Sequence, residues 1–155
     1  MRALLAVVVI LVALVSATPA SAQAITTRDP RAYMETLANT MGVSGMAPLR
    51  SIYGEINNGA ALSTTVEAAL LAYERGIPTT RAVIAKVEED VMLSDTYRQI
   101  YLYHYWGQNY WLHTRIDFVR ISADGEWAMS YVAFSSEWGN LTSATTPGFR
   151  VVSRN

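Results

Sequence analysis

The sequence predicts an α+β protein in which helices come first and an antiparallel sheet follows. Apolar residues recur at helical spacing in the first half, whereas twelve of the sixteen aromatic residues fall between Tyr97 and Trp138. Two stretches of turn-forming composition, 107–109 and 123–125, divide the aromatic half into hairpin-like runs. No linker composition separates the halves, so we expect residues 23–155 to form one domain.

The first 22 residues have the layout of a secretory signal peptide. Arg2 precedes an apolar run over 3–15, and Ala20-Ser21-Ala22 offers a cleavage site before Gln23. The run is shorter than the roughly 20 apolar residues that a membrane-spanning helix needs. We therefore expect cleavage after Ala22 and a periplasmic or secreted protein without membrane contact, with an uncleaved anchor as the alternative.

Helical spacing and cap residues predict three helices. These helices are expected over 29–41, about 48–56 and about 64–76. Asp29-Pro30 supplies a cap and an early helical proline for the first of them. Asn57-Asn58-Gly59 is the expected stop of the second, although an Asn-Gly pair is also typical of a hairpin turn. Gly76 ends the third.

Four strands are expected after the helices. The segment 82–93 fits both strand alternation and a helical stripe, and its Val and Ile content favours a strand. β-branched and aromatic residues indicate further strands over 96–106, 110–121 and 126–138, which should form an antiparallel meander. The tail over 142–155 is expected to fray.

Alternation along these strands predicts two different sheet faces. One register places Ile100 and Leu102 with Leu112, Ile116 and Phe118, and we expect it because it makes one face consistently apolar. The other face then combines tyrosines with polar residues. Its expected members are Tyr97, Gln99, Tyr101, Tyr103, Tyr105, Trp111, His113, Arg115 and Asp117.

Six residues of this second face form the candidate binding site. They are Tyr101, Tyr103, Trp111, His113, Arg115 and Asp117. Large aromatic bodies with polar tips, beside fixed charges, suit a pocket with a few oriented polar groups. The alternative is that the tyrosines are ordinary strand residues and that Arg115 pairs with Asp117 or with Glu137.

Metal, cofactor and nucleic-acid chemistry are not expected. His104 and His113 should lie on opposite faces, which argues against a shared metal site. His113 and Asp117 lie about 13 Å apart along a strand, too far for a catalytic dyad. The net charge is −1, and no basic cluster is present to bind phosphates. The chain has no cysteine, and Ser135-Ser136 lacks the glycines of a nucleophile elbow.

The chain also resembles a known group of proteins, through the segments 97–105, 111–120 and 126–130 and the helices expected before them. It resembles uncharacterised exported bacterial proteins of the nuclear transport factor 2-like (SnoaL-like, cystatin-like) superfamily. This resemblance implies that the helices and a curved sheet enclose a cone-shaped pocket. Some members are isomerases, dehydratases or hydrolases, and many only bind or dimerise. The acid and base residues of the enzymes have no matching positions here.

We therefore expect non-catalytic binding of a small apolar or amphipathic ligand in an aromatic pocket, homodimerisation, or both. A second subunit covering the aromatic face is compatible with ligand binding. The alternative is an isomerase- or hydrolase-type enzyme in which His113 or Asp117 is the general base.

Overall fold

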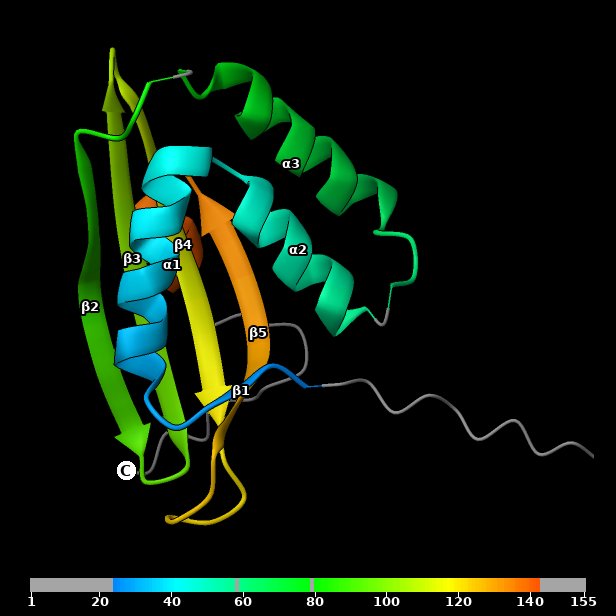
Figure 1. Cartoon of the computed structure of the whole chain (residues 1–155), viewed down its shortest axis with the longest axis vertical. Helices are drawn as coiled ribbons and strands as arrows, with labels where there is room; N and C mark the ends of the chain where they lie inside the picture. The colour runs from blue at the N-terminus through cyan, green and yellow to red at the C-terminus, as the bar shows by residue number, and fades with distance from the viewer. Residues whose placement is uncertain (1–23, 58, 79, 143–155) are drawn as a thin grey trace, which may run out of the picture.

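The chain has an α+β fold, seen in a computed structural model that describes residues 24–57, 59–78 and 80–142 (Figure 1). Three helices come first, namely α1 (Pro30–Ser44), α2 (Ala47–Ile56) and α3 (Thr64–Gly76). Four long strands follow, namely β2 (Ile84–Ser94), β3 (Tyr97–Gly107), β4 (Tyr110–Val119) and β5 (Trp127–Ser135). The fold is completed by the two-residue strand β1 (Thr26–Thr27) and the short helix α4 (Trp138–Thr142). The expected signal peptide and the tail beyond Thr142 lie outside the described residues.

Local sequence signals determine where the helices begin and end. The Asp29 side chain accepts a hydrogen bond from the Ala32 backbone N–H at 3.1 Å, which confirms the predicted cap of α1. Helix α1 continues past the predicted end and stops at Gly45, whose φ of 63° favours glycine. The Ser63 hydroxyl caps α3 through the Val66 N–H.

The strands form one curled antiparallel sheet in the order β1-β5-β4-β3-β2. The ambiguous segment 82–93 forms most of β2, so the strand interpretation is confirmed. At the β3–β4 turn Gln108 and Asn109 both have positive φ, 52° and 63°, as a type I′ hairpin requires. Ile100 pairs with Ile116 and Tyr103 with His113, which confirms the expected register.

The C-terminal part of the sheet differs from the prediction in two ways. The strand expected over 126–138 ends at Ser135, and Trp138 instead begins α4. Asp117 pairs with Tyr131 while the next residue of β4 pairs with Met129, so Ser130 is the extra residue of a β-bulge. The bulge shifts the phase of the alternation, which is why no single parity describes the two faces of β5.

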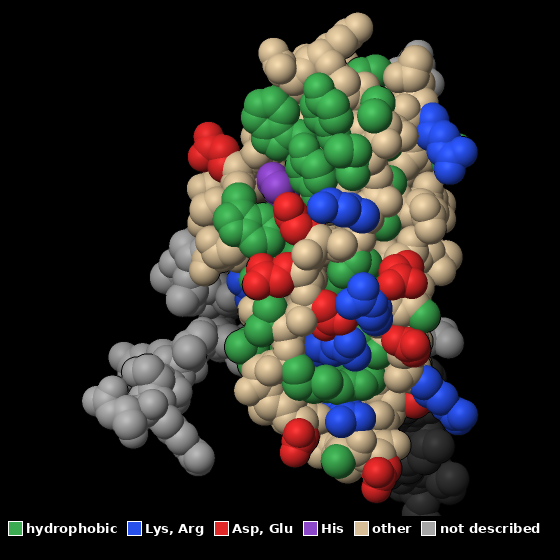
Figure 2. All heavy atoms as spheres, turned by 90° about the vertical axis from the view of Figure 1, so that its left-hand side faces the viewer, with side chains coloured by type: hydrophobic (Ala, Val, Ile, Leu, Met, Phe, Trp, Pro, Cys, Tyr) green, Lys and Arg blue, Asp and Glu red, His purple; other side chains and the backbone are tan. Residues whose placement is uncertain are grey.

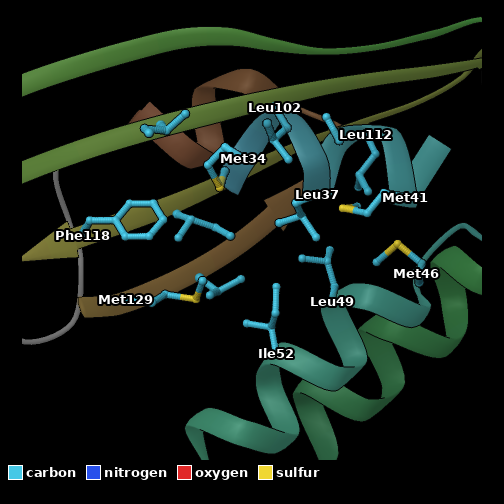
Figure 3. Close-up of a cluster of buried hydrophobic side chains, with 14 of the residues drawn as sticks. Met34, Leu37, Met41, Met46, Leu49, Ile52, Leu102, Leu112, Phe118 and Met129 are labelled. Atoms are coloured by element: carbon cyan, nitrogen blue, oxygen red, sulfur yellow. The ribbon is translucent and has the colours of Figure 1, made fainter. Parts of the chain in front are cut away.

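Helices α1 and α2 cover one face of the sheet, and the core lies between these helices and the sheet. Figure 3 shows side chains of the two helices and the loop between them pointing toward side chains of the strands. The helical and loop residues are Met34, Leu37, Met41, Met46, Leu49 and Ile52, and the strand residues include Leu102, Leu112, Phe118 and Met129. Each is at most 7% exposed, so this face is the buried apolar face that the register predicted.

Helix α3 lies outside α2 and contributes only Leu70 to the buried residues (Figure 1). Arg50 of α2 joins the two helices, with bidentate hydrogen bonds to Glu67 at 2.8 Å and to Glu74 at 3.0 Å. The two helices are also hydrogen-bonded to β5 and to the residue that follows it, through two tyrosine hydroxyls. These bonds run from Tyr53 to the Val132 carbonyl at 2.9 Å and from the Ser136 N–H to Tyr73 at 2.6 Å.

Candidate functional site

The sheet face that α1 and α2 do not cover is called the outer face. All six predicted binding residues lie there, because Tyr101 pairs with Arg115, Tyr103 with His113, and Trp111 with Tyr105 across β3 and β4. Asp117 has the same parity as Arg115. His104 lies on the core side and is fully buried, so the expectation that the two histidines lie on opposite faces is confirmed.

Arg115 and Asp117 form a buried ion pair on the outer face. Arg115 Nε and Nη2 donate to the two Asp117 oxygens, each at 2.7 Å, and the residues are 5% and 1% exposed. Tyr97 donates to the same carboxylate at 2.6 Å, and Arg115 also donates to the Leu141 carbonyl at 2.9 Å. Although burial lowers the pKa of Arg115, the hydrogen bonds to Asp117 raise it above its ordinary value.

His113 has an acidic partner that the sequence did not indicate. A register shift in β2 between Val87 and Glu89 marks a bulge at Glu88, whose carboxylate lies 3.1 Å from His113 Nδ1. The Trp138 ring packs edge-on against the imidazole, with centroids 5.2 Å apart, and also contacts Tyr101 at 4.9 Å. Helix α4 therefore covers the middle of the outer face, where Tyr101 is buried.

An aromatic-lined groove lies at the end of the sheet, beside the β3–β4 turn. We call it the hairpin groove. It has a volume of about 420 Å³ and is lined by Ala72 and Tyr73 of α3, by Asn109, Tyr110 and Trp111 at the start of β4, and by Ser136 after β5. Of the six predicted residues, the structure brings only Trp111 to this groove.

Hydrogen bonds and one close approach hold the walls of the hairpin groove. Trp111 Nε1–H donates to the Ser136 carbonyl, and the Ser136 N–H donates to the Tyr73 hydroxyl. The Tyr110 ring lies against Gly76, where a Cβ atom would come within 1.3 Å of the hydroxyl oxygen. Glycine at position 76 therefore both ends α3 and leaves space for Tyr110.

Tyr73 and Tyr110 were not predicted as site residues. Tyr73 follows the apolar spacing of α3 and reads as a packing residue, and Tyr110 reads as the first residue of a strand. Their meeting depends on how α3 crosses the end of the sheet, which no local pattern specifies. The glycine at position 76 is a signal of close approach, but it does not identify the partner.

Neither a metal centre nor a membrane span is found in the part of the chain that the structure describes. No group of three His, Cys, Asp or Glu residues there could hold a metal ion. No described helix is long and apolar enough to cross a membrane. Comparison with known proteins finds no matching family model, no matching curated protein and no matching solved structure. The fold and the groove therefore define this chain only as an α+β protein with an aromatic surface site.

Proposed function

We propose that the chain is a non-catalytic binding protein that holds a small amphipathic ligand in the hairpin groove. The observation that carries this proposal is the convergence of Tyr73, Tyr110 and Trp111, from two different elements, around about 420 Å³. Ligand sites commonly measure about 300–1,000 Å³ and combine aromatic walls with a few polar groups. Two further hollows, beside Tyr53 and beside Trp106, are lined by none of the six predicted binding residues.

The contacts of the two candidate general bases favour binding over catalysis. Asp117 accepts three hydrogen bonds of 2.6–2.7 Å from Arg115 and Tyr97, so a substrate would have to compete with a buried ion pair. His113 lies between Tyr103 and Trp138, with ring centroids 5.0 and 5.2 Å away. An isomerase or hydrolase that uses either residue remains the alternative. Preserved turnover in both the His113→Ala and the Asp117→Ala variants would exclude it.

Native mass spectrometry tests the binding proposal directly. The full chain is expressed with its signal sequence, and the exported product is weighed before and after denaturation. We expect a non-covalent adduct that is lost on denaturation and is absent from Trp111→Ala. Met92→Ala is the control, because Met92 is an exposed apolar residue at the opposite end of β2, 54% exposed, and does not line the groove. An adduct equally abundant in both variants would contradict the proposed site.

Self-association is a second candidate function, favoured by exposed apolar residues at the same end of the sheet. Val83, Ile84 and Trp111 are 73%, 39% and 38% exposed, and Ile84 and Trp111 both pair with Tyr105. Figure 2 views the molecule from the β2 side. Hydrophobic side chains gather at the upper end of this view, and most charged side chains lie below them. Such gathered apolar surface is typical of interaction sites.

Light scattering coupled to size exclusion tests the second candidate. A dimer is expected if the apolar end of the face is an interface, and Ile84→Glu should then convert it to monomer. Met92→Glu, at the opposite end of β2, is the control, since Met92 is 54% exposed. A wild-type protein that stays monomeric at high concentration would exclude a self-partner.

We also propose that the protein is exported and that its fold is the cone of the nuclear transport factor 2-like superfamily. Three helices followed by a curled antiparallel sheet support the cone, and the layout of residues 1–22 supports export. We expect the intact mass of the exported product to match a chain that begins at Gln23. Retention of residues 1–22 in that product would instead favour the uncleaved anchor.

A further inference from the structure

We propose that the ligand of the hairpin groove is a neutral saccharide. This inference rests on the proposed function, since it names the class of molecule that the groove takes. None of the six lining residues, all in the described part of the chain, carries a charge: they are three aromatic residues, an alanine, an asparagine and a serine. A charged ligand would lose hydration there without gaining an ionic partner from the walls.

Trp111 presents a stacking surface. The residue is 38% exposed, and its Nε1–H donates to the Ser136 carbonyl, which fixes the orientation of the indole ring. Because the only donor of the indole is already used, a ligand in the groove can contact Trp111 only through its ring. The C–H face of a pyranose ring is apolar and slightly positive, so it complements the electron-rich face of such an indole.

The polar groups beside Trp111 match hydroxyl groups. The Asn109 side chain is exposed at the turn and offers both an amide donor and a carbonyl acceptor. The Tyr73 hydroxyl accepts from the Ser136 N–H, and a hydroxyl group can also donate to a ligand. Burial raises the pKa of Tyr110, so this wall of the groove also stays neutral. A sugar hydroxyl both donates and accepts, and can therefore use each of these groups.

The position of the groove distinguishes a saccharide from a purely apolar ligand. Ala72, Asn109 and Trp111 are all exposed, so the groove is open to water and covers only one side of its ligand. An apolar molecule held there would leave much of its surface in water and lose that part of the hydrophobic stabilisation. The uncovered side of a saccharide carries hydroxyls that remain hydrated.

Amide NMR of the uniformly ¹⁵N-labelled exported protein tests this inference. The probes are three neutral trisaccharides of different linkage (maltotriose, cellotriose and triacetylchitotriose), with 2-naphthol as a neutral aromatic comparison. We expect at least one trisaccharide to give saturable shifts at the Trp111 indole N–H and the Asn109 side-chain amide. Affinity, followed at Asn109, should fall at least about tenfold in Trp111→Ala and hold in Met92→Ala.

Trp111→Phe is the second variant, because it keeps an aromatic face and should retain more affinity than alanine. Unchanged signals outside the groove verify that each variant is folded. If 2-naphthol shifts the groove signals and no trisaccharide does, the saccharide inference is wrong while the groove remains a binding site. If no probe shifts these signals and no adduct was found, the proposed function fails as well. Saccharide shifts confined to other residues would also overturn the inference.

Discussion

Replacing Arg115 with methionine should destabilise the protein strongly, because it leaves the Asp117 carboxylate buried without its cation. Asp117 is 1% exposed and would lose two hydrogen bonds of 2.7 Å, while the 2.6 Å bond from Tyr97 remains. Removing one partner of a buried pair costs about 3–5 kcal/mol. The surviving Tyr97 bond places our expectation near the lower limit, about 3 kcal/mol.

Urea unfolding at pH 7, followed by tryptophan fluorescence, measures this loss in the free energy of unfolding. With a slope typical of small domains, the midpoint should fall by roughly 1–3 M. Arg28→Met is the control, since the Arg28 and Glu126 side chains are 90% and 50% exposed and such pairs contribute about 0–1 kcal/mol. The double variant Arg115→Met/Asp117→Leu should recover most of the stability. A loss in Arg115→Met no larger than that in Arg28→Met would refute the reasoning.

Two further predictions concern a buried histidine and a glycine. Burial lowers the pKa of His104, so the unfolded chain takes up a proton first, and stability should fall as pH drops below about 6.5. Urea unfolding across this pH range should show a smaller loss in His104→Gln than in wild type or in His113→Gln; equal losses in all three would contradict it. Gly76→Ala should force Tyr110 out of the groove wall, which would weaken ligand binding and lower the melting temperature. Gly54→Ala in α2, where a Cβ meets nothing within 4 Å, should instead stabilise by about 0.5–1 kcal/mol, and a similar response of both variants would disprove the close approach.

Much of the fold could be predicted because its signals are local. The Asp29 cap, the Gly107-Gln108-Asn109 turn and the alternation in β3 and β4 each depend on residues close in sequence. The bulge at Ser130 could not be predicted in the same way, because it depends on how β5 adapts to β4. Helix α4 was missed because Trp138 continues an aromatic run that reads as strand, whereas the ring packs over Tyr101.

The candidate site was predictable only in part, for a related reason. Alternation places Trp111 and the Arg115–Asp117 pair on one face without any knowledge of the rest of the chain. The hairpin groove instead depends on contact between α3 and the start of β4, where Tyr73 and Tyr110 approach Trp111. Residues that lie far apart in the sequence leave no periodic signal of their contact, so the role of these two tyrosines could be recognised only from the structure.

The acidic run in β2 limits how copies of this chain can meet. Within the described part of the sheet, β2 is the terminal strand next to β3, and its outer hydrogen-bonding groups could template another strand. Three consecutive acidic residues, Glu88, Glu89 and Asp90, lie in the middle of this strand, and charged residues on an edge strand disfavour its pairing with another chain. The irregular pairing around Glu88 further disturbs a flat edge. The acidic residues and the bulge together therefore disfavour edge-to-edge pairing of β2 with the sheet of another copy.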